Sequence, residues 1–405
     1  MTKKHFDKLY KKLILELGLQ FERGMSLVIR CAPDYYSFAS KIAKEAYKQG
    51  ALNVEIDLVD THLIKERCKY QDKDQVSKLP QYLKAQDEER SKEKWAFLAI
   101  ADTENNTVLT NTDKDKLASY TKAKTALGKT GREGRMKFEI PWCIVCYPLK
   151  KWAKQVLNSN VDDMRDLLSK ILLLDKKDPV KAWQDFDLEF KKGNDYLNSL
   201  KIKTLHYISP ITDLTISLRE EAIWLGGSDE NNNKLLFVNI PTFEHFSVPD
   251  KYSVNGFVTT TRPVTVLQTL CNDIKFEFKD GKVVSCEAKE GQAALDQYLI
   301  SDENSAYLGE VALVDERTPI AQSGKIFNNI LFDENASCHI AIGAGYSVCL
   351  SNNKELDDDK KLEEYGCNTS SVHTDFMIGS PELNIFATTY EGKQVQIYKN
   401  GIFTF

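Results

Sequence analysis

The feature that most limits the fold is a pair of short apolar runs near the amino terminus, separated by one helix-like segment. Residues 26–31 and 53–58 have the length and composition of strands. Between them, Pro33 begins a segment with apolar residues at helical spacing, which ends near Gly50. A strand, a helix and a second strand at this distance favour parallel pairing. The sequence therefore predicts a βαβ unit and an α/β sheet in this region.

The pattern changes in the middle of the chain. Further strands are predicted at 95–101 and 142–147, with helical patterns around them, whereas from Thr204 onward short strands follow one another closely. A chain of 405 residues is also too long for one ordinary core. We therefore predict an α/β architecture with two domains: an N-terminal α/β domain with a mostly parallel sheet (1–200), and a strand-rich α+β C-terminal domain (201–405), in which all the candidate site residues described below lie.

Composition excludes several classes of protein. Hydrophobic residues make up 42% of the chain and charged residues 28%, which is typical of soluble globular proteins. The net charge of −5 gives no reason to expect nucleic acid as a partner, and no apolar run is long enough to predict a membrane span. The nine cysteines are scattered, which favours reduced thiols and a cytoplasmic location. Cys143 and Cys146 lie three apart in a predicted strand, on opposite faces, so a zinc or redox pair is not expected.

Residues 332–346 are the first candidate for a functional site. A polar turn carries Glu334, and a strand predicted to begin at His339 places its imidazole on the same face as Ala341 and Gly343. Such small neighbours leave room for a ligand beside the ring. This segment taken alone is equally consistent with a buried structural histidine, because a Glu-x4-His spacing carries little information. Tyr346 follows on the same segment.

A second strand-like run, residues 372–379, favours a metal site. In this run His373 and Asp375 share one face, while Val372, Thr374 and Phe376 share the other. Imidazole and carboxylate side by side are ligands that suit zinc, cobalt or manganese.

Two further carboxylates belong with these residues. Glu244 is predicted to lie in the loop after a strand at 234–240, and Glu310 in the middle of an apolar strand, sharing a face with Leu308 and Ala312. A buried carboxylate is costly unless it is paired, protonated or bound to a cation, and a salt bridge alone would account for Glu310. Together, four carboxylates and two imidazoles suffice for two metal ions with open coordination positions. His245 is expected to point away from Glu244, either at the surface or behind the residues that bind the metal.

Several motifs of the second half resemble the metallo-aminopeptidase family of aminopeptidases T, S and II. The resemblance is carried by Asn-Ile-Pro-Thr before Glu244, by the apolar run around Glu310, by Leu-Phe-Asp-Glu-Asn-Ala-Ser-Cys-His ending at His339, and by His-Thr-Asp-Phe-Met-Ile-Gly from His373. One departure is Phe243, where many relatives carry a second acidic residue.

The resemblance implies a cytoplasmic, homodimeric, metal-dependent aminopeptidase that releases single residues from peptides with a free N-terminus. It implies two divalent ions (zinc, cobalt, manganese or magnesium) and associates Glu310 and Tyr346 with catalysis. The implied metal ligands are Glu244, Glu310, Glu334, His339, His373 and Asp375.

The expected chemistry is hydrolysis by a water that two cations activate. Glu310, or less favourably Glu334, would accept its proton, and Tyr346 would donate to the developing oxyanion. Whether Glu310 bridges the metals, acts as the base or does both stays open at this stage. Two alternatives remain: a two-metal amidohydrolase acting on non-peptide amides, and a metal-stabilised protein without catalysis.

Overall fold

The computed structural model describes residues 1–405 except 106, 232–233, 268 and 357. The chain forms two compact units. Unit 1 comprises residues 1–184 and 228–241, and unit 2 comprises residues 185–227 and 242–405. The domains predicted as 1–200 and 201–405 remain a prediction, and the units described here are defined by their internal contacts.

Unit 1 contains a five-stranded sheet in which every strand is parallel to its neighbours, in the order β2-β1-β3-β4-β9. This confirms the predicted α/β class with a parallel sheet. The last strand, β9, comes from a distant part of the sequence. The chain enters unit 2 after residue 184 and returns to unit 1 at residue 228, and β9 forms after that return. The strand bounds are β1 (Leu27–Cys31), β2 (Val54–Leu58), β3 (Ala96–Ile100), β4 (Trp142–Val145) and β9 (Asn239–Ile240).

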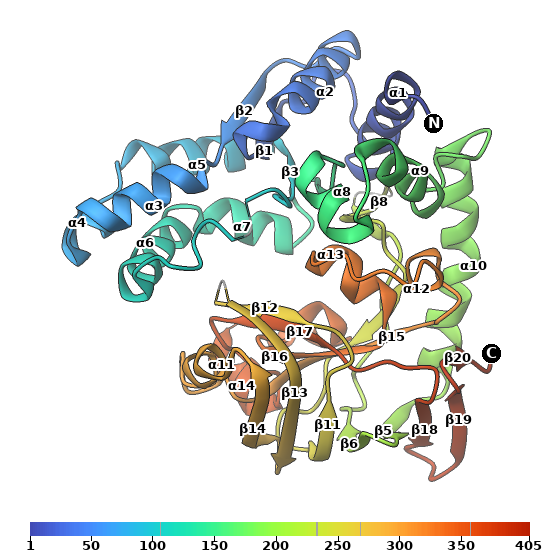
Figure 1. The fold of residues 1–405 in the computed structure, drawn as a ribbon. Helices are drawn as coiled ribbons and strands as arrows, with labels where there is room; N and C mark the ends of the chain where they lie inside the picture. Colours follow the sequence, from blue (N-terminus) through green and yellow to red (C-terminus); the bar gives the residue numbers. More distant parts are fainter. Residues whose placement is uncertain (106, 232–233, 268, 357) are drawn as a thin grey trace. The chain divides into compact units, whose positions relative to one another are not determined.

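The amphipathic N-terminal segment forms α1 (Lys3–Leu13), which continues as a short π-helix, η1 (Ile14–Gly18). Its apolar face is fully buried because Phe6 and Tyr10 pack against aromatic rings from other elements. The partners are Phe38 of α2 (Tyr36–Lys48) and Tyr147, whose rings stack with centroids 4.0 Å apart. Helices α1 and α2 therefore lie side by side (Figure 1).

A second group of helices in unit 1, α3 to α7, includes one helix, α5, that charged side chains join to the sheet. Among their described residues, α5 and α6 bury no side chain. Arg90 of α5 instead pairs with Asp57 of β2 at 2.8 Å and with the neighbouring Glu55, and Asp87 accepts the Gly131 N–H of α7 at 2.9 Å. Their bounds are α3 (Thr61–Tyr70), α4 (Lys73–Ser77), α5 (Tyr82–Lys92), α6 (Lys114–Leu127) and α7 (Lys129–Met136).

The remaining elements of unit 1 are short or helical. Helices α8 (Lys150–Leu157) and α9 (Val161–Ile171) follow β4, and α10 (Pro179–Ser199) leads from unit 1 into unit 2. The single strand predicted at 234–240 is instead two short strands, β8 (Lys234–Leu236) and β9, of which β8 pairs with β7 (Asp229–Asn231). Within the described part of the chain, no helix has both the length and the apolar character needed to cross a membrane.

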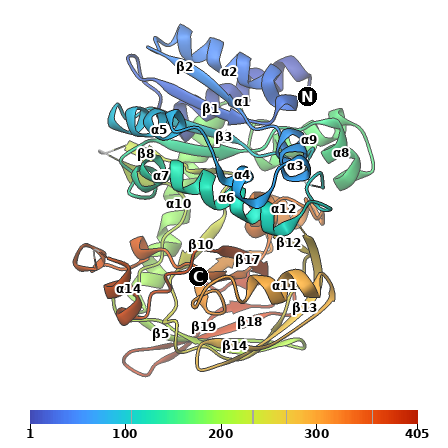
Figure 2. The same cartoon turned by 90° about the vertical axis from the view of Figure 1, so that its left-hand side faces the viewer.

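Unit 2 is built from two sheets that face each other across one apolar core. A four-stranded antiparallel sheet, β10-β15-β16-β17, contributes Val311, Leu313, Ile340 and Phe376 to that core. A nine-stranded sheet, β12-β13-β11-β6-β5-β18-β19-β20 with β14 paired to β13, covers it. Helix α11 (Gln292–Tyr298) packs against β12, β13 and β14 (Figure 2). These sheets confirm the predicted strand-rich α+β half.

The strands of unit 2 agree in part with the sequence analysis. The predicted hairpin at Asp280-Gly281 is present, with both residues at positive φ, as a two-residue turn requires. The closing strands β18, β19 and β20 were not anticipated. The larger sheet consists of β5 (Ile202–Ser209), β6 (Thr212–Ser217), β11 (Asn255–Thr259), β12 (Val264–Val266), β13 (Thr269–Lys279), β14 (Lys282–Glu290), β18 (Asn384–Thr389), β19 (Gln394–Lys399) and β20 (Ile402–Phe403).

Candidate metal centre and active site

The candidate site lies on the face of the four-stranded sheet that is turned away from the apolar core. The strands are β10 (Glu244–Ser247), β15 (Leu308–Val314), β16 (His339–Gly343) and β17 (His373–Met377). Paired residues of antiparallel strands point to the same side of a sheet. Ala341 pairs with both Glu310 and Asp375, and Ala312 pairs with His339. Gly343 pairs with His373, and Val314 with Glu244, so one face collects Glu244, Glu310, His339, His373 and Asp375.

Two expectations about this face were wrong. Glu244 does not lie in a loop but begins β10, and its pairing with Val314 fixes its direction. Glu310 shares its face with Ala312, as predicted, but not with Leu308, which pairs with Ile342 and enters the core. The cause is a β-bulge between Leu308 and Glu310, which adds one residue to β15.

Glu310 lies between the two imidazoles. One of its carboxylate oxygens is 3.6 Å from Nε2 of His339, and the other is 3.7 Å from Nε2 of His373. Glu244 approaches the first imidazole at 3.2 Å, and Asp375 the second at 3.3 Å. Among the described residues, two sets therefore bring three ligand atoms within 4.8 Å of one another. These are Glu244–Glu310–His339 and Glu310–His373–Asp375, with Glu310 in both.

Backbone carbonyls hold both imidazoles in one orientation. Nδ1 of His339 is 3.1 Å from the Ser337 carbonyl oxygen, and Nδ1 of His373 is 2.7 Å from that of Ala344. A carbonyl oxygen only accepts, so Nδ1–H must donate, and Nε2 of each ring faces the carboxylates, where loss of its proton would free it to ligate a cation. Metal-ligating histidines are usually oriented in this way. The sequence contained no signal for these acceptors, because both are main-chain atoms.

Glu334 lies beside the two sets. It begins a 3-10 turn, η3 (Glu334–Ala336), after the short helix α13 (Ile330–Asp333). Burial and then the negative charges of Glu244 and Asp375 raise its pKa well above the ordinary value. Its neighbour Asn335 is fully buried.

Asn335 is a supporting residue that the sequence analysis missed. Its side-chain oxygen accepts the N–H of Phe243, and its amide donates to the Leu331 carbonyl at 2.9 Å. It therefore links the residue before Glu244 to the turn that carries Glu334.

Tyr346 follows β16 and lies next to the second set. Its ring centroid is 5.0 Å from that of His373. Burial, followed by the charges of Glu310 and Asp375, raises the pKa of the phenol well above its usual value. The Tyr346 ring therefore lies against His373, one of the candidate metal ligands.

The donor set fits divalent cations. Burial first, and then Asp375, raise the pKa of Glu310, although His339 works in the opposite direction. Burial lowers the pKa of His373, but Asp375 and Glu310 outweigh it and raise the value to about 9. Several buried carboxylates that face one another favour positive charge between them. Two imidazoles with fixed Nε2 atoms, surrounded by carboxylate oxygens, are the mixed N/O ligands that transition-metal dications take.

His245 does not belong to the site. As predicted, it points away from Glu244, since it pairs with Leu313 on the core side of the sheet. It is not a surface residue, however, because only 3% of it is exposed. Its ring stacks on Phe190 with centroids 3.9 Å apart, and its Nδ1 contacts the Asn194 side chain at 2.5 Å. Burial lowers its pKa to about 3, so the ring stays neutral.

Comparisons with known proteins agree on one family. The sequence profile of the thermophilic metalloprotease (M29) family matches residues 3–403. The chain is 32% identical over 402 residues to aminopeptidase AmpS of Bacillus subtilis (strain 168), covering 98% of both. It is also 32% identical over 408 residues to aminopeptidase 2 of Geobacillus stearothermophilus, covering 99% of this chain and 98% of the other.

A solved structure has the same fold. The structure of wild-type AmpT from Thermus thermophilus superposes with a TM-score of 0.90 at 28% identity and covers 100% of both chains. The family match spans nearly the whole sequence, and the matched relatives are aminopeptidases. This chain therefore belongs to the thermophilic metalloprotease (M29) family and is a metal-dependent aminopeptidase.

Proposed function

We propose that this aminopeptidase holds two divalent cations, one at Glu244–Glu310–His339 and one at Glu310–His373–Asp375. The observation that carries the proposal is the position of Glu310, whose two oxygens face different imidazoles. Glu334, which is buried near Glu244 and Asp375, is assigned as a sixth ligand beside these two groups. An imidazole in each group favours zinc, cobalt or manganese over magnesium, which prefers oxygen ligands and retained water.

We assign the chemical steps to Glu310 and Tyr346. When bound, divalent cations supply Lewis acidity for the scissile carbonyl and for a nucleophilic water. Glu310 accepts the proton of that water and passes it to the leaving amine, in addition to holding the cations. The Tyr346 phenol, which lies against His373, donates to the oxygen that gains charge in the transition state.

The ligand set also accounts for action at amino ends. Four carboxylates around two dications nearly balance the charge, so a neutral α-amine is accommodated better than another anion. Anchoring that amine holds the first peptide bond over the site. Peptides should be shortened one residue at a time, and N-acetylation should lower kcat/KM at least about a hundredfold, or roughly 2.7 kcal/mol. Release of internal fragments first in a mass-spectrometric time course would contradict this assignment.

We further propose that the enzyme acts in the cytoplasm as a homodimer. The nine cysteines, all within the described residues, are free thiols, and most are buried, which suits a reducing compartment. The dimer rests on the family resemblance alone. Sedimentation equilibrium tests it, since a monomeric mass throughout the assay concentration range would exclude the dimer.

Metal stoichiometry tests the two-cation proposal directly. Elemental analysis should give two ions per chain, and His373→Ala should lose one while keeping the other. Chelation should abolish hydrolysis with little change in far-ultraviolet dichroism, because the strands that carry the ligands pack on their own apolar core. A single ion per chain in the fully active enzyme would refute the proposal. Collapse of the fold on chelation would indicate a structural role instead.

A further inference from the structure

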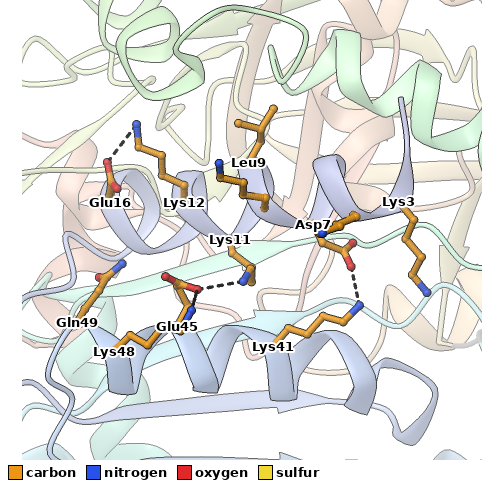
Figure 3. Close-up of a pocket in the computed structure, with 12 residues that line it drawn as sticks. Lys3, Asp7, Leu9, Lys11, Lys12, Glu16, Lys41, Glu45, Lys48 and Gln49 are labelled. Atoms are coloured by element: carbon orange, nitrogen blue, oxygen red, sulfur yellow. Dashed lines mark hydrogen bonds and ion pairs between the residues drawn. The ribbon is translucent and has the colours of Figure 1, made fainter.

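A basic groove in unit 1 has no assigned role. It lies between α1, η1 and α2 and has a volume of about 790 Å³ (Figure 3). Seven lysines and three carboxylates line it, an excess of four positive charges in a chain whose net charge is −5. The lysines are Lys3, Lys4, Lys8, Lys11, Lys12, Lys41 and Lys48.

The carboxylates of the groove are all engaged by lysines. Asp7 pairs with Lys41 at 2.7 Å, and Glu45 with Lys11 at 3.2 Å, so these ion pairs connect α1 to α2 (Figure 3). Lys48 also approaches Glu45, and Lys12 lies 3.7 Å from Glu16 and 3.4 Å from Asp178 outside the groove. In contrast, Lys3, Lys4 and Lys8 have no carboxylate within ion-pair distance among the described residues.

Two of the unpaired lysines, Lys4 and Lys8, belong to a regular row on α1. Lys4, Lys8 and Lys12 are four residues apart on one helix, so they lie on the same face at intervals of about 6 Å, and of the three only Lys12 has carboxylate partners. In an extended peptide, alternate side chains point the same way at intervals of roughly 6.6–6.8 Å. A strand with acidic residues at every second position would therefore meet successive lysines of this row.

We propose that this groove binds an extended, acidic peptide segment of a partner protein, with carboxylates at alternate positions. The segment lies along α1, and its carboxylates pair with Lys4 and Lys8. The ion pairs between α1 and α2 form the base on which it rests.

The lining argues against nucleic acid as the occupant. Within the described structure, the groove residues include neither an arginine nor an aromatic side chain. Single-stranded nucleic acid is usually bound by stacking on aromatic rings, and phosphates are most often recognised by bidentate arginine.

A membrane surface is disfavoured for a different reason. A helix that binds lipid inserts its apolar face among the acyl chains. In α1 that face consists of Phe6, Tyr10 and Leu13, which are fully buried in unit 1. Only the charged face of α1 is exposed to a partner, so an acidic peptide is favoured over a membrane surface.

Fluorescence anisotropy tests the proposal. The probe is a labelled peptide, blocked at both ends, with glutamate at every second position. Lys4→Gln/Lys8→Gln should weaken its binding at least about fivefold at low ionic strength, because each exposed ion pair contributes only modestly. Added salt should remove most of the difference. Both lysines are exposed and have no ion-pair partner among the described residues, so the thermal midpoint should not change.

The matched control is Lys114→Gln/Lys122→Gln, which removes the same charge from the exposed face of α6. It should change the affinity less than twofold. Equal binding by the Lys4/Lys8 variant and the unchanged protein would overturn the proposal, since the peptide would then bind elsewhere, including at the catalytic site. An equal loss in the control would also overturn it. Tighter binding of a charge-matched oligothymidylate or of anionic vesicles would exclude a peptide as the preferred partner.

Discussion

The bulge beside Glu310 makes Gly309→Ala a sharp test of how the site is held. A β-carbon added to Gly309 would lie 2.1 Å from the carbonyl oxygen of Ala344 and 2.4 Å from that of Gly343. Carbon and oxygen atoms that are not bonded stay at least about 3 Å apart, so a gap of roughly 0.9 Å must open. Both clashing atoms belong to the backbone, and no change of rotamer relieves the contact.

The clash can be relieved by moving either of two backbone segments, and each of them carries a residue of the active site. Either β15 moves with Glu310, or the segment after β16 moves with Tyr346. Overpacking of this kind costs roughly 1–3 kcal/mol of folding free energy. A misplacement of about 1 Å near reacting groups costs on the order of a hundredfold in rate. We therefore expect kcat to fall about a hundredfold with a smaller change in KM, and the free energy of unfolding to fall by roughly 2 kcal/mol.

The assay combines aminoacyl-nitroanilide hydrolysis with denaturant unfolding of the metal-loaded protein. Gly128→Ala is the control, because its added β-carbon would come no closer than 3.9 Å to another atom and Gly128 has a negative φ. This control should retain activity and stability. If Gly309→Ala kept the same activity and stability as this control, the close approach of the two backbone segments would not be what positions the catalytic groups.

Three further outcomes follow from other parts of unit 2. Tyr346→Phe should keep the full metal content and a near-normal KM while kcat falls, because a donor used in the transition state does not affect substrate binding; loss of metal on analysis would show a structural phenol. Asn335→Leu should cost roughly 1–3 kcal/mol in denaturant melts of the metal-free protein, because the buried N–H of Phe243 loses its acceptor; an unchanged midpoint would contradict this. Burial raises the pKa of Asp302, but hydrogen bonds from Ser371 outweigh it and lower the pKa below the usual value. The stabilising effect of Asp302 is fully present above the unfolded-state pKa of about 3.9 and is lost as the pH falls through the folded value. Asp302→Asn should therefore be less stable than the unchanged protein at neutral pH, and the difference should be smaller at pH 3. A stability difference that stayed constant between these two pH values would exclude this linkage.

Local patterns predicted much of the fold because they depend on short stretches of sequence. The period of two in residues 339–343 and 373–377 placed both histidines and Asp375 on strands and gave each its correct face. The parallel sheet of unit 1 followed from the spacing of strand, helix and strand. In both cases the information lies within a few residues of the elements themselves.

Features that depend on a distant partner could not be predicted in the same way. The bulge at Gly309 exists only in relation to the opposite strand, so a regular alternation assigned Leu308 to the wrong face. Glu244 is in a strand because β15, more than sixty residues later, offers it hydrogen bonds. Asn335 acts through the Phe243 N–H, and no spacing in the sequence indicates that contact.

The sparse packing of α5 and α6 has a consequence for local motion in unit 1. Helices α5 and α6 bury no side chain among their described residues, and α5 is held to β2 through the ion pairs of Arg90. The free energy that separates the attached from the detached state is therefore small beside that of the aromatic packing under α1. Amide hydrogens in α5 and α6 should exchange with solvent through local opening, long before those of β1 and β3. Added salt should speed that exchange in α5, because it screens the ion pairs of Arg90.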